Sequence, residues 1–357
     1  MERIFMKGSE AIAESAVRAG CRFFAGYPIT PQNEIPEYFS RRLPEVGGVF
    51  VQGESEIASV NMIYGAASGG VRAMTSSSSC GIALKSEGIS YLAAARFPCV
   101  ICSVMRGGPG CGEIKPAQQD YFQATKASGN GGFRTLVYAP STVQEAVDLM
   151  GLSFEKAEQY RYPVILLVDG FIAVMMEPVS LPAMLTDERL AEIRENADKW
   201  ALGGRKPGEG TRMLGWEADK SLMEQNIREA AMYEGWKKTE TMVEEYLTED
   251  AKLIITAYGT SARIARSAVE VLRAEGRKVG LIRPVALYPF AGEPWEKLNY
   301  EKLKGILVAE MSIPALYVED VQAAVARRCG NIRTVLSSGG VILTRDQVLK
   351  AAREMLQ

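Results

Sequence analysis

The N-terminal half of the chain alternates between short apolar runs and longer amphipathic stretches. Apolar runs of about four to eight residues are typical of buried strands, and apolar residues at three- and four-residue spacing are typical of helices. Repeated strand–helix units of this kind build a parallel sheet with helices on both faces. The predicted elements, in order, are helix Lys7–Ala19, strand Cys21–Ala25, helix Pro31–Leu43, strand Val49–Gln52, helix Glu54–Ser68, strand Val71–Thr75, helix Cys80–Ala95, strand Pro98–Met105, helix Pro116–Lys126, strand Thr135–Tyr138, helix Thr142–Gln159 and strand Pro163–Val168.

The pattern weakens between Glu177 and Thr248, where the glycine-rich stretch Gly203–Gly210 separates two charged helical segments. We expect this part to connect two domains and to wrap a neighbour. Alternation then resumes and predicts a second, smaller α/β domain. Its elements are strand Ala251–Ala257, helix Ser261–Ala274, strand Lys278–Ile282, strand Gly305–Ala309 and helix Tyr317–Arg328. The expected division is residues 1–178, a connecting segment 179–248, and residues 249–357.

Composition narrows the classes of function. A chain of 357 residues with 47% hydrophobic residues can bury more than one core, which fits two domains. Its net charge is −2 and it has no long basic run, so we do not expect nucleic acid as a partner. The longest apolar runs, such as Pro163–Val168, are far shorter than the roughly 20 residues that span a bilayer. With an early acid at Glu2 and no apolar leader, we expect a cytoplasmic protein and no membrane contact.

The chain contains no histidine, which excludes Ser-His-Asp and Cys-His nucleophiles and any His-ligated metal site within it. The six cysteines lack the spacing of a ferredoxin cluster. Cys99 and Cys102 have C-x-x-C spacing, but they lie inside an apolar run and are interpreted as buried strand residues. Acid–base chemistry must therefore depend on carboxylates, Lys, Tyr, Cys or a cofactor, and we predict no metal site on this chain.

Two strand-end loops carry candidate site residues. In Gly26–Pro31, two prolines fix the backbone around Thr30; the alternative is that Thr30 only caps a helix that has Pro at its first position. In Gly53–Ala58, Glu54 and Glu56 open a helix; the alternative is that both carboxylates only complement the helix dipole.

A third loop, Arg106–Gly112, follows directly after an apolar strand. An arginine at a strand end, followed by residues without bulky side chains, is suited to bind a carboxylate through two parallel hydrogen bonds. The loop has neither G-x-G-x-x-G spacing nor the Lys-Ser/Thr of a P-loop, so it indicates neither a dinucleotide nor ATP. The alternative is a flexible turn with a surface arginine.

In their order and separation, these loops resemble the alpha subunit of 2-oxoacid:ferredoxin oxidoreductases, most closely the 2-oxoisovalerate (3-methyl-2-oxobutanoate) type. The resemblance spans nearly the whole chain. Its motifs are Gly26–Pro31, Glu54–Gly65, Met74–Ser79, Lys85–Tyr91, Met105–Pro109, Pro116–Thr125, Ala257–Arg263 and Val279–Pro284.

The resemblance implies a pyrimidine-type thiamine-diphosphate-binding domain, doubly wound, followed by a transketolase-C-terminal-like domain. Glu56 matches the carboxylate that hydrogen-bonds N1′ of the cofactor's aminopyrimidine, so that the cofactor itself supplies the base that removes its C2 proton. Thr30 matches a threonine beside substrate and cofactor, and Arg106 matches an arginine that binds the 2-oxoacid carboxylate.

The implied reaction is oxidative decarboxylation of a 2-oxoacid, with the acyl group passing to coenzyme A and electrons passing through iron–sulfur clusters to ferredoxin. The chain has no Gly-Asp-Gly followed by Asn, the usual diphosphate and magnesium motif, since Val168–Gly170 lacks the continuation. We therefore expect the thiamine diphosphate to be shared with a beta subunit carrying the diphosphate-binding domain. Mg²⁺ and the clusters are expected on partners, including gamma and iron–sulfur delta subunits, and this subunit alone should be inactive.

The chain departs from the family pattern at Cys80, Cys111, the stretch Asn130–Phe133 and the stretch Met311–Ala315. These departures leave the 2-oxoacid open. A branched-chain substrate is favoured, with 2-oxoglutarate and pyruvate as alternatives. Two other readings also stay open: a transketolase-like or decarboxylase half-enzyme without a redox step, and a non-catalytic scaffold subunit.

Overall fold

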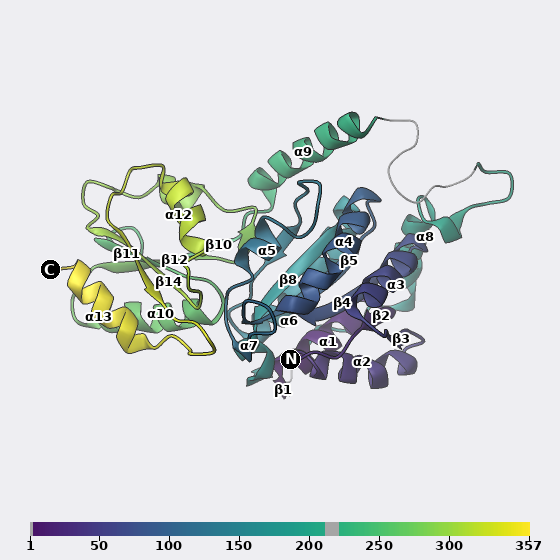
Figure 1. Ribbon diagram of the computed structural model, residues 1–357, viewed down its shortest axis with the longest axis horizontal. Coiled ribbons are helices and arrows are strands. Elements are labelled where there is room, and N and C mark those ends of the chain that lie inside the picture. The colour runs from purple at the N-terminus through teal and green to yellow at the C-terminus, as the bar shows by residue number, and fades with distance from the viewer. Residues whose placement is uncertain (1–2, 211–220) are drawn as a thin grey trace.

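In a computed structural model that describes residues 3–210 and 221–357, the apolar runs of the N-terminal half become neighbouring strands of one sheet (Figure 1). The sheet has eight strands in the order β13-β7-β8-β5-β4-β2-β3, with β6 paired to β5. Its strands are β2 (Phe23–Gly26), β3 (Val49–Gln52), β4 (Ala73–Ser78), β5 (Cys99–Gly107), β6 (Glu113–Pro116), β7 (Leu136–Tyr138), β8 (Pro163–Asp169) and β13 (Ala286–Tyr288). The accompanying helices are α1 (Gly8–Arg18), α2 (Glu34–Glu45), α3 (Glu56–Ser68), α4 (Ser79–Ala94), α5 (Tyr121–Thr125), α6 (Val143–Tyr160) and α7 (Gly170–Val174).

The central strands are buried on both faces, as their continuous apolar runs predict. Every residue of β5 and β8 is buried, and the pairs β4–β5, β5–β8 and β7–β8 are parallel. Successive side chains of β5 point to opposite faces of the sheet and pack into two separate hydrophobic cores. Val100 and Cys102 pack with α1, α2 and α6, whereas Ile101 and Met105 pack with α3 and α4. The predicted doubly wound α/β fold is confirmed, and so is the interpretation of Cys99 and Cys102 as buried strand residues, whose thiol pKa values are raised by burial.

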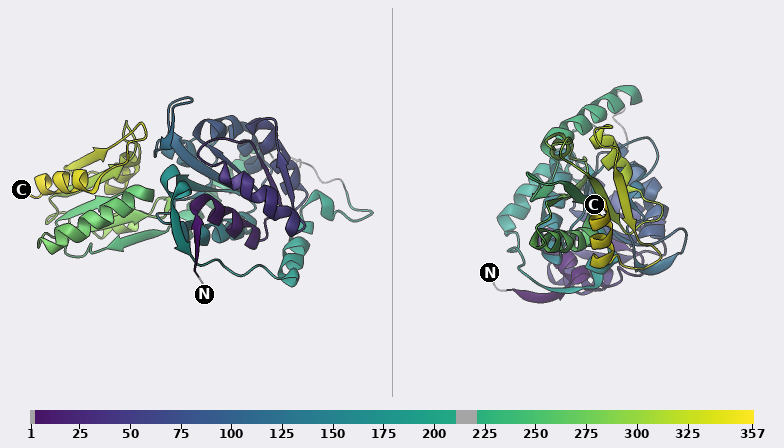
Figure 2. Two further views of the ribbon diagram at one scale, coloured as in Figure 1. Left: turned by 90° about the horizontal axis from the view of Figure 1, so that it is seen from below. Right: turned by 90° about the vertical axis from the view of Figure 1, so that its left-hand side faces the viewer.

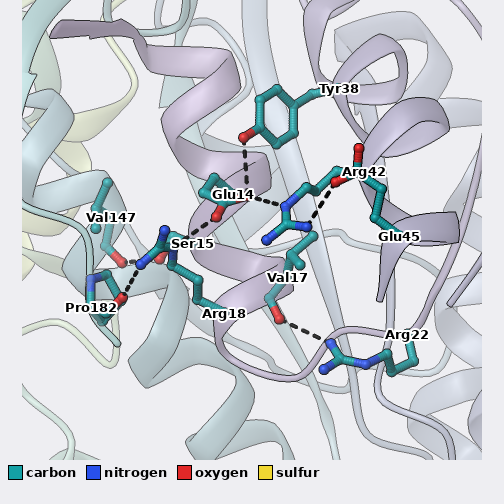
Figure 3. A network of polar contacts seen from close by, with 10 residues as sticks. All are labelled: Glu14, Ser15, Val17, Arg18, Arg22, Tyr38, Arg42, Glu45, Val147 and Pro182. Atoms are coloured by element: carbon teal, nitrogen blue, oxygen red, sulfur yellow. Dashed lines mark hydrogen bonds and ion pairs between the residues drawn. The ribbon is translucent and has the colours of Figure 1, made fainter. Parts of the chain in front are cut away.

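A buried carboxylate joins the first two helices (Figure 3). Glu14 of α1 accepts hydrogen bonds from Tyr38 Oη (3.0 Å) and Arg42 Nε (3.1 Å) of α2, and from Arg18 Nε (2.7 Å). On the same helix, Ser15 Oγ donates to the carbonyl of Val147 in α6 (2.7 Å). Helices α1, α2 and α6 are therefore held together by polar contacts as well as by apolar packing.

Two predicted helices are wrong in their bounds. The predicted helix from Pro31 begins only at Glu34, and Asn33 precedes it. The predicted helix Pro116–Lys126 is divided into the end of β6, an irregular segment and the short α5. The irregular segment contains Gln118, whose backbone N–H donates to the carbonyl of Met311 (2.8 Å). Tertiary hydrogen bonds override the local helical pattern there.

The second lobe contains a five-stranded sheet in the order β10-β12-β11-β14-β15, in which only β10 is antiparallel to its neighbour. Its strands are β10 (Val243–Tyr246), β11 (Leu253–Thr256), β12 (Val279–Pro284), β14 (Gly305–Glu310) and β15 (Ile332–Leu336). Its helices are α10 (Gly259–Ala274), α11 (Glu293–Glu296), α12 (Tyr317–Val325) and α13 (Arg345–Met355).

Between the two sheets the chain forms the antiparallel pair β1 (Ile4–Lys7) and β9 (Met176–Val179), then α8 (Asp187–Asp198), the short 3₁₀ helix Leu202–Gly204 and α9 (Leu222–Thr239). The pair β1–β9 was not predicted. Residues 211–220 of the predicted connecting segment lie outside the described residues. The division at residues 178 and 248 stays a prediction.

The two lobes lie side by side (Figure 2). They meet through buried polar contacts. Gln118 Oε1 accepts from Ser261 Oγ (2.7 Å) and Met311 N (3.0 Å), and Gln118 Nε2 donates to the Tyr258 carbonyl (2.8 Å). Asp169, at the end of β8, accepts from Thr260 N (2.7 Å) and Thr260 Oγ1 (2.6 Å). In addition, β13 crosses from the C-terminal part into the first sheet beside β7. These contacts fix one lobe against the other.

Candidate functional site

Four loops meet at the carboxyl edge of the first sheet. They follow β2, β3, β4 and β5, four strands that pair in parallel, so their carboxyl ends lie at one edge. In open α/β sheets this edge is where ligands bind. At these ends, Thr30 follows β2, Glu56 begins α3 after β3, Ser79 begins α4 directly after β4, and Arg106 is the last residue but one of β5. The three predicted site residues thus lie on neighbouring strand ends.

Arg106 is buried, with 5% of its surface exposed, so the reading of a surface arginine on a flexible turn is wrong. Its NH1 donates to the Thr30 carbonyl (2.8 Å), and its NH2 donates to the Cys111 carbonyl (3.0 Å). The same NH2 lies 3.1 Å from Cys80 Sγ. Within the described chain, its Nε has no hydrogen-bond partner. The guanidinium is therefore held in place with donor capacity left over for a ligand.

Thr30 lies beside Arg106 and does not cap α2. Its carbonyl accepts the hydrogen bond from Arg106 instead of starting the helix, which begins after Asn33. Its side chain is half-buried, and Thr30 Oγ1 accepts a long contact from Asn33 Nδ2 (3.5 Å). The structure thus brings Thr30 and Arg106 together, although 76 residues separate them in sequence.

Glu56 and Glu54 differ in burial. Ser55 is the N-cap of α3, and its Oγ accepts from Ala58 N (3.1 Å). This cap turns Glu56 inward, where 6% of its surface is exposed, and leaves Glu54 in solvent. Among the residues that the structure describes, none donates a hydrogen bond to the Glu56 carboxylate. A nearly buried carboxylate in this condition takes its hydrogen bonds from a ligand, a partner or water.

The first turn of α4 connects Glu56 with Arg106. A Cβ atom on Gly81 would lie 2.6 Å from Glu56 Oε1 and 2.1 Å from Ser77 Oγ, so only glycine leaves room for the carboxylate there. The preceding residue, Cys80, contacts the Arg106 guanidinium. Glu56 and Arg106 therefore flank the same helical turn.

Ser79 and Asp120, which sequence reasoning did not single out, are linked to Arg106. Ser79 Oγ accepts from Arg106 N (3.0 Å) and donates to Asp120 Oδ2 (2.5 Å). Burial raises the pKa of Asp120 to about 6, while the Ser79 hydrogen bond and the positive charge of Arg106 oppose this rise. A carboxyl of this kind can hold or release a proton near neutral pH. Asp120 lies in the Pro116–Thr125 motif of the resemblance, within a stretch that was predicted to be helical, but nothing in that pattern marked it as a site residue.

Lys85 of α4 was also missed. It is fully buried, and its Nζ donates to the carbonyl of Glu56 (3.3 Å). Burial lowers the pKa of this ammonium to about 8, and the negative charge of Glu56 limits the fall. The spacing could have indicated it, since Gly81 and Lys85 are four residues apart and share one helix face.

The residues that depart from the family pattern differ in burial and in their contacts with the site residues. Cys80 is partly buried beside Arg106, and Cys111 is exposed with its Sγ 3.8 Å from Arg106 NH2. Asn130 is exposed, and its backbone N–H donates to Ser90 Oγ (2.9 Å). Met311 is buried where the lobes meet. Cys80 and Cys111 thus adjoin the guanidinium, whereas the structure shows no contact between Asn130 and the site residues.

In the described residues, no group of three or more Cys, Asp or Glu side chains is arranged to hold a metal ion. No helix among these residues is long and apolar enough to cross a membrane. Unpaired groups at the sheet edge include an acceptor, the Glu56 carboxylate, to which no described residue donates, and the buried side-chain atoms Ser77 Oγ, Ser78 Oγ and Arg106 Nε. This set suits an organic ligand with an N–H group and a ligand with a carboxylate.

Comparisons with known proteins agree with this chemistry. Residues 14–234 match the family described as "Pyruvate flavodoxin/ferredoxin oxidoreductase, thiamine diP-bdg", and residues 251–348 match "Pyruvate:ferredoxin oxidoreductase core domain II". The chain is 42% identical over 351 residues to the ketoisovalerate oxidoreductase subunit VorB of Methanothermobacter thermautotrophicus, covering 98% of this chain and 97% of that subunit.

Two solved structures are similar. One is the 2-oxoglutarate:ferredoxin oxidoreductase from Magnetococcus marinus with 2-oxoglutarate, coenzyme A and succinyl-CoA bound; it has a TM-score of 0.85 and 25% identity, over 100% of this chain and 66% of that chain. The other is a split gene transketolase, an inactive beta4 tetramer, with a TM-score of 0.59 and 14% identity over 98% of both chains. The second likeness concerns the fold alone.

Proposed function

The chain belongs to the pyruvate flavodoxin/ferredoxin oxidoreductase family, and on this premise we propose that it is the alpha subunit of a thiamine-diphosphate-dependent 2-oxoacid:ferredoxin oxidoreductase. The observation that carries the proposal is the nearly buried Glu56 carboxylate, without a donor in the described chain, at the sheet edge where Thr30 and Arg106 meet. The likeness to VorB favours a branched-chain 2-oxoacid such as 3-methyl-2-oxobutanoate. 2-Oxoglutarate and pyruvate remain the alternatives.

The residues present fit the family's cofactor. When bound, thiamine diphosphate supplies a carbanion that adds to the 2-oxo group and makes loss of CO₂ feasible. Glu56 would hold N1′ of the aminopyrimidine through a hydrogen bond to its carboxylate. Gly81 leaves the space that this carboxylate occupies, and the Ser55 cap fixes its direction.

Arg106 would bind the 2-oxoacid carboxylate. Its hydrogen bonds to the carbonyls of Thr30 and Cys111 fix the plane of the guanidinium before substrate arrives, so less side-chain freedom is lost on binding. Thr30 would line the same site from the neighbouring loop. Asp120, linked to Arg106 through Ser79, can hold a proton beside that site near neutral pH.

We further propose that the diphosphate and Mg²⁺ are held by a beta subunit, and that the iron–sulfur clusters lie on partner subunits. In support, the relatives VorB and its counterpart from a second Methanothermobacter are named as subunits, and the chain lacks the Gly-Asp-Gly motif with its distant Asn. Gamma and iron–sulfur delta subunits, coenzyme A and ferredoxin would complete the reaction.

Co-expression with a subunit that carries the diphosphate motif tests the proposal. The complex should reduce a dye in the presence of thiamine diphosphate, coenzyme A and a 2-oxoacid. Glu56→Gln should lower kcat by about 10²–10⁴-fold, because a general acid–base contribution of that order is lost. Glu54→Gln is the matched control, since Glu54 is an exposed carboxylate two residues away and should leave kcat unchanged.

Near-full activity of Glu56→Gln would contradict the assignment of Glu56. Turnover without an electron acceptor would instead favour a decarboxylase or transketolase-like reaction. A panel of 3-methyl-2-oxobutanoate, 2-oxoglutarate and pyruvate, compared by kcat/KM, decides the substrate. If Arg106→Ala altered assembly but left turnover unchanged, the chain would be a scaffold.

A further inference from the structure

Two cysteine sulfurs lie against one nitrogen of Arg106. Cys80 Sγ is 3.1 Å from Arg106 NH2, and Cys111 Sγ is 3.8 Å from the same atom. These two contacts limit the distance between the sulfurs to about 7 Å, whereas a disulfide bond needs about 2 Å. Cys80 belongs to the first turn of α4, and Cys111 lies in the loop between β5 and β6. Two separate elements therefore bring their thiols to the same guanidinium.

The two cysteines differ in exposure, which suits a thiol pair in which one member reacts first. Cys111 is exposed, as are its neighbours Pro109 and Gly110, whereas Cys80 is partly buried. A Cβ atom on Gly110 would meet no other atom within 4 Å, so the loop has free space there. Cys111 is thus open to a dissolved oxidant, and its loop has room for the few ångströms of movement that a bond to Cys80 requires.

The other four cysteines are not arranged in this way. Three of them are buried, and burial raises the pKa of their thiols: Cys21, Cys99 and Cys102. Cys99 and Cys102 also pack into different cores, on opposite faces of the sheet. Cys329 is partly buried in the second lobe, with its Sγ 3.7 Å from the carbonyl of Asn331. Thiol chemistry at this pair is therefore expected to be selective.

A bridge between Cys80 and Cys111 would occupy the atom on which carboxylate binding depends. The two edges of a guanidinium that present parallel N–H groups, Nε with NH2 and NH1 with NH2, both include NH2. A disulfide drawn across Arg106 NH2 would cover this nitrogen and shift the loop whose Cys111 carbonyl accepts its hydrogen bond (3.0 Å). Neither edge could then hold a carboxylate through two hydrogen bonds.

We propose that Cys80 and Cys111 are a redox modification site. A low-molecular-weight disulfide, with glutathione disulfide as the probe, converts the two thiols into a bridge across Arg106, and the bridge closes the substrate site until it is reduced. The inference rests on the proposed role of Arg106 and adds a regulation of that same site.

The exchange is balanced without a further reactant. The Cys111 thiolate attacks one sulfur of glutathione disulfide, the S–S bond of the reagent breaks, and one glutathione leaves as a thiol with the proton that Cys111 gave up. The Cys80 thiolate then attacks Cys111 Sγ, the Cys80–Cys111 bond forms, and the second glutathione leaves with the proton of Cys80. Two protein thiols are oxidised, and one disulfide is reduced to two thiols.

Disulfide mapping tests the bridge without measuring turnover. The assembled complex is equilibrated anaerobically at pH 8 with increasing ratios of oxidised to reduced glutathione, its free thiols are alkylated, and the peptides of this chain are mapped by mass spectrometry. A linked Cys80–Cys111 peptide pair should accumulate in the wild type and disappear after dithiothreitol. Cys111→Ser should give no bridge. Cys329→Ser is the matched control, since it removes a partly buried thiol of the second lobe and should leave the bridge unchanged.

The effect on substrate binding is measured on the same samples after glutathione has been removed. The fully oxidised wild type should have a KM for the 2-oxoacid at least about tenfold above that of the reduced complex, because hydrogen bonds to a charged group are lost, and dithiothreitol should reverse the rise. Cys111→Ser should have the same KM after either treatment, whereas Cys329→Ser should respond as the wild type does. If Cys111→Ser does not assemble, Cys111→Ala is measured in its place against the same criteria.

Three results would overturn the inference. In the first, Cys111 is found only as a mixed disulfide with glutathione and no bridge forms. In the second, the bridge forms but KM does not change. In the third, the rise in KM persists in Cys111→Ser, which would assign it to thiols of other subunits. The proposed function is judged separately by Arg106→Lys in the reduced complex, where an unchanged KM would remove the role of Arg106 itself.

Discussion

Replacing Lys85 by methionine should make the folded chain more stable at neutral pH. The ordinary pKa of a lysine is 10.5, and burial lowers that of Lys85 to about 8. Each pKa unit corresponds to about 1.4 kcal/mol, so holding this ammonium inside the fold costs about 3 kcal/mol below pH 8. The hydrogen bond to the Glu56 carbonyl offsets about 1 kcal/mol of this cost. The net gain expected for Lys85→Met at pH 7 is therefore about 2 kcal/mol, because the lowered pKa already includes the attraction between Lys85 and Glu56.

The gain should disappear at alkaline pH. Between pH 8 and 10.5 the unfolded wild-type chain still holds the Lys85 proton, whereas the folded chain has released it. Wild-type stability therefore rises over this window, by at most about 1.4 kcal/mol per pH unit from this group, and overtakes the variant. Below pH 8 both states hold the proton and the full cost is present.

Urea unfolding of the full chain at pH 7, 8, 9 and 10 measures the effect as the difference between variant and wild type, in which other titrating groups cancel. As a matched control, Lys350→Met changes an exposed lysine of α13 and should differ from wild type by no more than about 0.5 kcal/mol throughout, as is usual for surface changes. A Lys85→Met chain that is less stable than wild type at pH 7 would refute the reasoning. So would a difference that does not change between pH 7 and 10.

Two other substitutions test the site. Gly81→Ala should raise the Kd for thiamine diphosphate in the complex by at least about tenfold, because the new Cβ would lie 2.6 Å from Glu56 Oε1. Gly235→Ala is the control, since a Cβ at this position in α9 would meet no other atom. Equal Kd values for the two variants would argue against the position assigned to Glu56. Arg106→Lys should raise KM for the 2-oxoacid by about 10–100-fold with a smaller fall in kcat, because lysine cannot form two parallel hydrogen bonds to a carboxylate. An unchanged KM in steady-state assays would show that Arg106 does not bind the substrate.

Local patterns were sufficient for most of the first sheet. The apolar runs that became β5 and β8 are buried on both faces of a parallel sheet, and this requires only that each run be apolar throughout. Placing Arg106 at the sheet edge needed only its position after such a run. The helix Thr142–Gln159 was predicted nearly as the structure shows it, since Thr142 is a good N-cap and the apolar spacing continues to Tyr160.

Local sequence patterns did not predict the elements whose hydrogen-bond partners lie far away in the sequence. The segment around Gln118 has a helical pattern, but its backbone and side chain are bonded to Met311, 193 residues away, so it stays irregular. Strand β13 looks like part of the second lobe, yet it pairs with β7 of the first. Hydrogen bonds of this kind depend on how the lobes meet, which no window of sequence contains.

By itself, the sequence determined the α/β class and the order of the strand-end loops, because periodicity and strand ends are properties of neighbouring residues; its resemblance to a known family then selected the three candidate residues Thr30, Glu56 and Arg106. Only the tertiary structure decided which of Glu54 and Glu56 is buried, that Arg106 is held by the Thr30 carbonyl, and that Lys85 lies behind Glu56. Burial and charge compensation arise from groups 29 to 76 residues apart that meet across the helices and strand ends, and their free energies have no counterpart in the local pattern.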